Sequence, residues 1–327
     1  MTNKEFKEAA RLHQVDFKVN NQEIGIPADR FLVRRLVRNG KEYLIDVPSS
    51  LLWKDCKDEN GGYRIFYSGF RKEITEAVNA TESSSKGQMV TNLLRSEHIP
   101  YNLFFPMEQF DREGAVKVFN DILGGDRIKS IGKIEIEYNP GGLNDGTAFD
   151  TYVEYVTHDN KKGGIGIEVK YTEKEYPIKR GSKEWNETHD HVTSGIHLAE
   201  NYREPSFKSR WFKLQFIEDV ADLESDAARE HVVANPYRQI WRNHLLGAKM
   251  VLDGVLSEFT SLTVYPEGNG HFNDIWEKYE RKLTPEGLES FRHITYEELF
   301  PLLRKHLLRV PCHNEWVDYL ESRYLVK

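Results

Sequence analysis

The clearest period of two along the chain runs from Ile131 to Tyr138, where isoleucines alternate with lysine and glutamate. Successive side chains of a strand point to opposite faces of a sheet, so this alternation predicts a half-buried strand. Two more extended segments, Ala148–Thr157 and Ile165–Thr172, predict a β-hairpin. Phe259–Tyr265 predicts a fourth strand, which Pro266 ends. We therefore expect these four segments to form a sheet.

Apolar residues at every third or fourth position predict a helix over Lys86–Ser96, ahead of the first strand. Val90, Leu93 and Leu94 form its apolar stripe, and Glu97 continues the stripe where another apolar residue would be expected. A carboxylate on the buried side of a helix needs a partner, and a metal ion is one such partner. The alternative is that Glu97 lies on a frayed last turn in water.

A second helix is predicted between the third and fourth strands. Asn235 suits the N-cap, Pro236 suits the first helical position, and the apolar period continues to about Leu256. This helix completes the order of helix, three strands, helix and strand.

Three polar residues leave the apolar stripe of this second helix, namely Gln239, Arg242 and Asn243. Of these, we expect Gln239 and Arg242 to face a cleft. The alternative for each is an ordinary solvated helix face.

The remaining parts of the chain are less regular. Residues 1–85 contain a predicted helix near the start and two extended pieces, Arg30–Val37 and Lys41–Val47, around a turn at Asn39-Gly40. A serine-rich stretch before Lys86 predicts a flexible joint, so we place a domain boundary there. The N-terminal part is predicted to add recognition or dimer contacts.

The second predicted domain spans residues 86–327 and contains a long insertion at 173–234. A loop of that length is usually functional or disordered. A helical region follows at 284–327, with helices expected over Tyr296–Leu307 and Glu315–Tyr324.

Composition narrows the class of protein. The 327 residues are 39% hydrophobic and 30% charged, as in globular proteins. No stretch approaches the apolar length that spans a bilayer, and the first seven residues lack the apolar core of a signal peptide. Cys56 and Cys312 match no zinc or redox spacing, so both are expected to be reduced thiols. These features predict a cytoplasmic protein without membrane contacts.

Charged residues occupy the predicted hairpin in a pattern that suits metal-dependent chemistry. Glu168 and Lys170 share one face of their strand, while Ile167 and Val169 take the other face. Asp150 lies at the mouth of the preceding strand. Carboxylate oxygens hold Mg²⁺, and a lysine supplies positive charge near an attacking water. The alternative is a cross-strand ion pair on a solvated face.

The pairing of the two hairpin strands has two possible registers. With a turn centred on Asp159, Asp150 lies directly opposite Glu168. With a turn over residues 161–164, Asp150 is displaced along the strand. A bulge at Gly163-Gly164 would reconcile the two, because glycine tolerates the required backbone angles.

Asp150, Glu168 and Lys170 together resemble the active-site motif of the PD-(D/E)XK nuclease superfamily, the fold of many restriction endonucleases. In that motif an Asp precedes a Glu-x-Lys on the neighbouring strand. Phe149 stands where the motif often has proline, a position that varies within the superfamily. Ser96–Phe104 also resembles a stretch found upstream of the motif in a group of bacterial nuclease-like proteins of this superfamily.

The resemblance implies an α/β fold with a restriction-endonuclease-like core (αβββαβ), in which helices flank a central mixed sheet. It implies that Asp150 and Glu168 bind Mg²⁺, for which Mn²⁺ can substitute. The carbonyl of Val169 and the side chain of Glu97 would complete the ligands, and Lys170 would orient the attacking water. In this superfamily the helix before the fourth strand often carries a polar or basic residue that touches the metal-bound water or a phosphate, so the resemblance also implies that Gln239 and Arg242 contact the substrate.

The implied activity is that of a Mg²⁺-dependent DNA endonuclease, a hydrolase of phosphodiester bonds of the restriction or defence type. Its partner would be double-stranded DNA, and cutting both strands favours a homodimer. Two alternatives remain open at this point. One is a catalytically silent nucleic-acid-binding module, and the other is a nuclease subunit of a larger defence or recombination complex.

The net charge of −7 does not exclude DNA, because contact needs a basic surface only where the duplex lies. Two basic pairs flank the hairpin, and we expect both to contact phosphates: Lys161 with Lys162, and Lys179 with Arg180. The alternative for each pair is a solvated face.

Two other ligand classes receive little support. His189, His191 and His197 have spacings that can bind zinc, but no fourth ligand is evident, which favours surface histidines. The chain has no Walker phosphate loop, so no nucleotide cofactor is expected.

Overall fold

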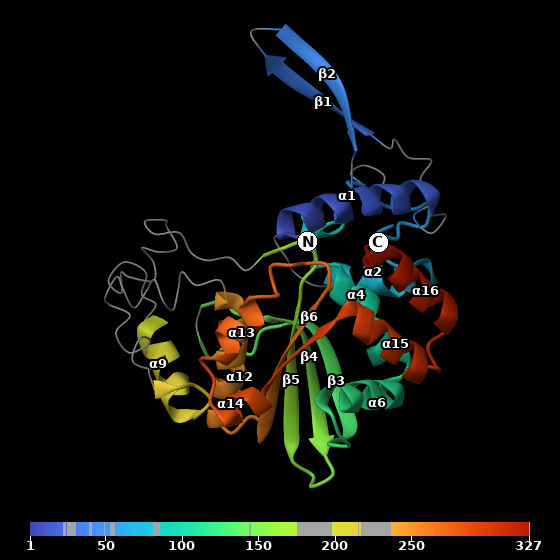
Figure 1. Ribbon diagram of the computed structural model, residues 1–327. Helices are drawn as coiled ribbons and strands as arrows, with labels where there is room; N and C mark the ends of the chain where they lie inside the picture. The colour runs from blue at the N-terminus through green and yellow to red at the C-terminus, as the bar shows by residue number, and fades with distance from the viewer. Residues whose placement is uncertain are drawn as a thin grey trace.

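The computed structural model describes residues 1–21, 24, 31–38, 41–48, 50–52, 56–80, 86–143, 145–174, 198–214, 216 and 237–326. Figure 1 shows a layered arrangement in which helices lie on both sides of a sheet. Both chain ends lie at the same end of that sheet.

The helices of the described residues are α1 (Asn3–Asn20), the 3-10 turn η2 (Ser68–Phe70), α2 (Arg71–Ala80), α3 (Lys86–Met89), α4 (Ile99–Leu103), α5 (Phe105–Phe110), α6 (Arg112–Leu123), α9 (Leu198–Lys208), α12 (Arg238–Leu252), α13 (Ile275–Glu280), α14 (Pro285–Glu289), α15 (Tyr296–His306) and α16 (His313–Tyr324). The strands are β1 (Phe31–Arg38), β2 (Lys41–Pro48), β3 (Ile128–Tyr138), β4 (Phe149–Thr157), β5 (Lys162–Val169), β6 (Glu258–Tyr265) and β7 (Phe291–Thr295).

The described strands form a five-stranded sheet in the order β3-β4-β5-β6-β7 and a separate hairpin of β1 and β2. β3, β4 and β5 pair antiparallel, whereas β5, β6 and β7 pair parallel. A mixed sheet between helices confirms the predicted α/β architecture, and the four strands predicted for it are found as β3 to β6. The fifth, β7, was not predicted, because its five residues give too short a pattern.

The hairpin of β4 and β5 takes the first of the two predicted registers. The pairing of the two strands continues without a register shift from Val156↔Lys162 to Thr151↔Ile167. The turn therefore centres on Asp159, and one step beyond the last pair Asp150 comes opposite Glu168. The glycines at 163 and 164 pair regularly within this ladder, so no bulge is needed there.

Two buried apolar clusters lie against the sheet. One contains Ile165, Ile167 and Val169 of β5 together with residues of α1, α6, α15 and α16. The other contains Phe259 of β6 and Trp241 of α12. Since side chains alternate along a strand, β5 gives its branched residues to the first cluster and turns Glu168 towards α12.

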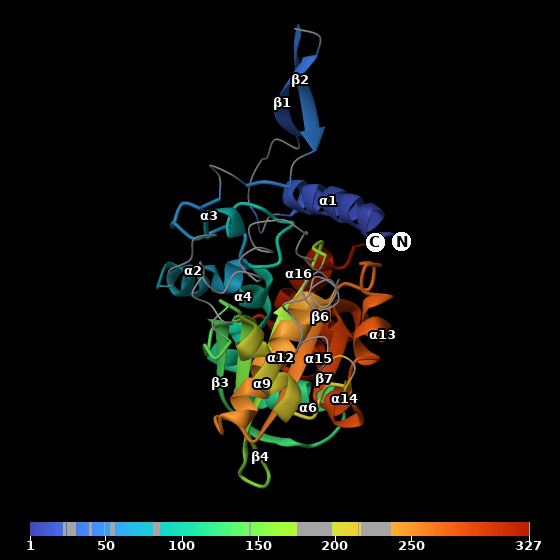
Figure 2. The same ribbon diagram turned by 90° about the vertical axis from the view of Figure 1, so that its left-hand side faces the viewer.

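The helix α1 lies across the end of the sheet at which β5 ends, and the β1–β2 hairpin extends away from it (Figures 1 and 2). Phe6 of α1 is buried and packs edge-to-face on Tyr171, with ring centroids 6.2 Å apart. Phe6 belongs to the same cluster as Ile165. The predicted boundary near residue 85 therefore does not coincide with a gap in the packing, and it stays a prediction.

The helix predicted over Lys86–Ser96 is wrong beyond its first four residues, which form α3. A distant segment competes for the backbone that follows. The N–H of Leu52 donates to the carbonyl of Thr91 at 2.8 Å, and the N–H of Leu93 donates to the carbonyl of Ser50 at 3.1 Å. Pairing with residues 50–52 thus replaces the local helical hydrogen bonds.

Most other predicted elements are confirmed, including the first helix as α1, the extended pieces as β1 and β2, and the last two helices as α15 and α16. The predicted start of the second core helix at Asn235 and Pro236 lies outside the described residues. That helix ends at Leu252 instead of Leu256, since Gly254 takes a left-handed backbone with φ +72°. None of the described helices is both long and apolar enough to cross a membrane.

Gly247 lets α12 approach β6 closely. A Cβ at this position would lie 2.0 Å from ring atoms of Phe259, so one of the two elements would have to move. We expect Gly247→Ala to lower the free energy of unfolding by about 1–3 kcal/mol in urea denaturation. Gly87→Ala is the control, because a Cβ there meets nothing within 4 Å. Equal stability of the two variants would contradict this packing.

Candidate active site

Asp150 and Glu168 come together because β4 and β5 pair in the register described above. Asp150 is the second residue of β4, and its Oδ2 accepts a hydrogen bond from the backbone N–H of Val169 at 2.7 Å. The carboxylate is thus held against the neighbouring strand. Glu168, one residue before Val169, is buried.

Lys170 is the third member of the group and follows β5 directly. Its Nζ donates to Glu168 Oε1 at 2.5 Å and to Gln239 Oε1 at 2.8 Å. The backbone of Lys170 is fixed as well. Its N–H donates to the carbonyl of Val264 at 2.8 Å, and the carbonyl of Lys170 accepts from the hydroxyl of Tyr296 at 2.6 Å. An ammonium with a side chain only 4% exposed is therefore held in one position.

The helix α12 supplies two amide side chains, Gln239 and Asn243, which lie one helical turn apart. Asn243 is buried, and its Nδ2 donates to Glu168 Oε2 at 2.5 Å. Both oxygens of Glu168 therefore have a donor. The sequence indicated that Asn243 leaves the apolar stripe, but it was not preferred as a site residue. Its spacing of four from Gln239 was the available signal.

Arg242 was predicted to contact a substrate, but the structure directs its side chain elsewhere. Its Nε donates to Asp145 Oδ2 at 2.7 Å, and Tyr202 of α9 donates to the same oxygen at 2.5 Å. Burial would raise the pKa of Asp145, but the charge of Arg242 and these hydrogen bonds lower it to about 2. Arg242 thus anchors the loop that leads to Asp150.

Glu97 lies in a turn before α4 and not on a helix stripe. Arg95 donates from Nε to both of its carboxylate oxygens at 2.8 Å. Glu97 lines the same pocket as Asp150, Glu168 and Lys170. In this arrangement Arg95 occupies the carboxylate of Glu97. The role of Glu97 as a metal ligand stays a prediction.

Sequence reasoning missed a further carboxylate, Glu137. It falls opposite Asp150 between the pairs Ile136↔Thr151 and Tyr138↔Phe149, and its φ of +59° is left-handed, which is rare outside glycine. Glu137 is exposed, yet partial loss of hydration and then the charges of Glu168 and Glu97 raise its pKa to about 7. The alternation of β3 gave no signal, because it assigns Glu137 to the solvated face.

The carboxylates around Asp150 outnumber the cations. Burial raises the pKa of Asp150 well above its usual range, and the charge of Glu168 raises it further, although Lys170 opposes this. An excess of buried negative charge with oxygen donors fits a hard divalent cation. Across the described part of the chain, no three His, Cys, Asp or Glu residues lie close enough to hold a metal ion by themselves. Two carboxylates completed by water would be the fitting mode, as Mg²⁺ commonly keeps several waters.

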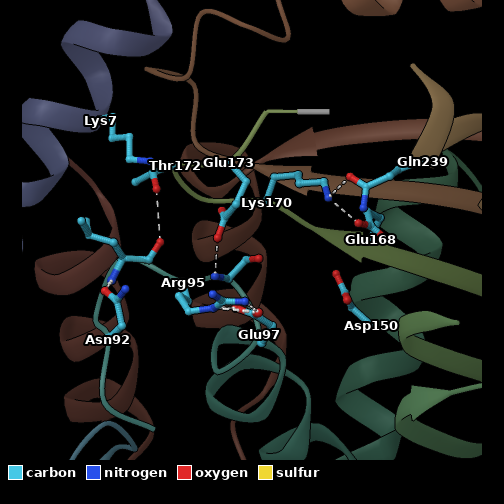
Figure 3. Close-up of a pocket in the computed structure, with 12 residues that line it drawn as sticks. Lys7, Asn92, Arg95, Glu97, Asp150, Glu168, Lys170, Thr172, Glu173 and Gln239 are labelled. Carbon is cyan, nitrogen blue, oxygen red and sulfur yellow. Dashed lines mark hydrogen bonds and ion pairs between the residues drawn. The ribbon is translucent and has the colours of Figure 1, made fainter. Parts of the chain in front are cut away.

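Asp150, Glu168 and Lys170 line a cavity of about 470 Å³ (Figure 3). Its lining is mostly polar and comes from α1, the turn before α4, β4, β5 and the residues after it, and α12. The lining residues are Lys7, Asn92, Leu94, Arg95, Ser96, Glu97, Asp150, Glu168, Lys170, Thr172, Glu173 and Gln239. One pocket therefore contains the three residues that the sequence matched to a nuclease motif.

The model of the PD-(D/E)XK nuclease superfamily matches residues 1–326, essentially the whole chain. The chain belongs to this superfamily. Its mixed sheet flanked by helices is accordingly of the restriction-endonuclease type, as predicted. No curated protein and no solved structure matches the chain.

Membership of the PD-(D/E)XK superfamily makes the protein a nuclease that acts on nucleic acid. The match extends into residues 1–85, which the sequence resemblance did not cover. This agrees with the packing of α1 on the core.

Of the two basic pairs predicted to contact phosphates, the one within the described residues lies away from the nuclease pocket. Lys162 is the first residue of β5, roughly 20 Å along the strand from Glu168, and Lys161 precedes it. Lys162 pairs with Glu154 at 2.9 Å instead. Lys179 and Arg180 lie outside the described residues, as do the three histidines considered for zinc.

The raised pKa of Asp150 makes a prediction about stability without metal. A raised folded-state pKa stabilises the fold below the unfolded pKa, and this contribution is lost as pH rises through the folded pKa. In EDTA, Asp150→Asn should therefore be more stable than the wild type at about pH 8, and the difference should vanish near pH 4. Urea denaturation across this range measures it. Asp159→Asn, in the exposed hairpin turn, is the control and should show no such pH dependence. A gap that is constant with pH would contradict the crowding of carboxylates.

Proposed function

We propose that this nuclease is a Mg²⁺-dependent DNA endonuclease. The observation that carries the proposal is the convergence of Asp150, Glu168 and Lys170 in one pocket. Asp150 and Glu168 would hold the cation, and Mn²⁺ would substitute for Mg²⁺. The backbone of Val169 lies beside Asp150, where its carbonyl is the predicted further ligand. When bound, a divalent cation supplies positive charge to the phosphate oxygens at the cleaved bond.

The residues of the chain provide the remaining chemistry. Lys170 would direct its ammonium at the attacking water and at the charge that builds on the phosphoryl oxygens. Its hydrogen bonds to Glu168 and Gln239 restrict where the ammonium can go. Asn243 fixes the second oxygen of Glu168, so that this carboxylate keeps its orientation while a ligand binds.

We further propose double-stranded DNA as the substrate and a restriction or defence role. Cutting both strands needs two active sites, which favours a homodimer. The net charge of −7 is compatible with this, because only the duplex-facing surface must be basic.

Loss of the lysine should abolish cleavage. We expect Lys170→Ala and Asp150→Ala each to lower the rate of plasmid cleavage with Mg²⁺ by at least about a hundredfold, since both remove charge stabilisation at the reacting phosphate. Lys170→Ala should still bind DNA. Lys117→Ala, an exposed lysine of α6, should keep full activity. Equal rates for wild type and Lys170→Ala would refute the mechanism, and cleavage that survives EDTA would refute the role of metal.

Metal binding should also be visible without any substrate. A ligand that binds only the folded state stabilises it, by about 2.7 kcal/mol at a hundredfold excess over Kd. We expect Mg²⁺ to raise the unfolding midpoint of the wild type and not that of Asp150→Asn. Asp159→Asn should respond to Mg²⁺ as the wild type does. A full response in Asp150→Asn would show that the cation binds elsewhere.

A further inference from the structure

Lys7 of α1 lines the active-site pocket, although it is far in sequence from the residues of the nuclease motif. In Figure 3 Lys7 and Asn92 lie towards one side of the pocket, whereas Asp150 and Glu168 lie towards the other. The pocket therefore has an acidic side and a side where Lys7 presents its ammonium.

The other cations of the lining already have acidic partners. Arg95 pairs with Glu97, and Lys170 pairs with Glu168. Lys7 is exposed, and among the described lining cations it is the one for which the structure records no hydrogen bond or ion pair. Its charge is thus available to a ligand that enters the pocket.

Asn92 adds a neutral donor on the same side. The N–H of Leu94 donates to Asn92 Oδ1 at 3.0 Å, which identifies the oxygen of the amide and leaves Nδ2 with its two hydrogens for another acceptor. An ammonium together with an amide N–H group suits an anionic oxygen, and phosphate oxygens are such acceptors.

The backbone that carries Lys7 is fixed relative to the reacting groups. Asn3 Nδ2 donates to Asn269 Oδ1 at 2.7 Å, and Phe6 packs on Tyr171, the residue after Lys170. The helix therefore cannot withdraw without breaking the core, and only the side chain of Lys7 has to adjust to a ligand.

We infer that Lys7 and Asn92 bind a phosphate of the DNA strand that is cut, next to the cleaved phosphate and across the pocket from Asp150 and Glu168. This inference rests on the proposed function and names a contact of the same substrate. It makes α1 a part of the substrate-binding surface.

Fluorescence anisotropy with a labelled DNA duplex tests the contact, with every variant made in a Lys170→Ala background so that the DNA stays intact. Lys7→Ala should weaken binding about fivefold and reduce the slope of log K against log salt by about 0.9, the value of one lost phosphate contact. Asn92→Asp keeps the acceptor for Leu94 but adds negative charge, and it should weaken binding more. In the active protein, Lys7→Ala should raise KM and leave kcat unchanged.

Lys4→Ala is the matched control, because Lys4 is an exposed lysine of the same helix that does not line the pocket. It should keep the affinity and salt slope of the background, and Lys7→Arg should restore most of the binding. If Lys7→Ala binds like Lys4→Ala while the wild type cleaves DNA, the inference about Lys7 is overturned and the proposed function stands. If the wild type neither binds nor cleaves DNA, both are overturned.

Discussion

The site depends on the antiparallel register of β4 and β5, in which the backbone N–H of Val169 donates a hydrogen bond to Asp150. Side chains alternate along a strand, so a slip of one residue would send Glu168 into the apolar cluster and Ile167 towards α12. The slip is prevented because Ile165, Ile167 and Val169 are fully buried on the other face. The hydrophobic core thus fixes the positions of the charged groups.

That geometry places like charges together, which a structure selected for stability alone would avoid. The pKa of Asp150 is raised first by burial and then by Glu168, and Glu137 takes a left-handed backbone beside them. The donors from Lys170 and Asn243 to Glu168 offset only part of this repulsion. Strain and shifted pKa values concentrated at one point of a fold are typical of functional sites. A divalent cation bound as proposed would relieve this repulsion.

The sequence predicted those parts of the fold that depend on local pattern. Alternation found β3, and extended segments found β4 to β6. The spacing Glu-x-Lys found two members of the site, because strand geometry puts alternate residues on one face. The sequence did not predict those parts of the fold that depend on contacts between distant segments. Glu97 read as helical because the pairing of residues 91–93 with 50–52 is not local. Lys161 and Lys162 flank the hairpin in sequence, but they lie at the end of β5 away from the site.

The pocket is assembled from segments that are far apart in the chain, and this assembly gives α1 a role beyond packing. The sheet supplies Asp150 and Glu168, α12 supplies Gln239, and α1 supplies Lys7 from the other side. A strand that is held on both sides of the cleaved bond binds more tightly, since each phosphate contact adds to the affinity. The acidic side alone provides one such contact. A cationic side carried by a helix that shares the core of the sheet provides a second, at a distance that the packing of Phe6 on Tyr171 keeps fixed.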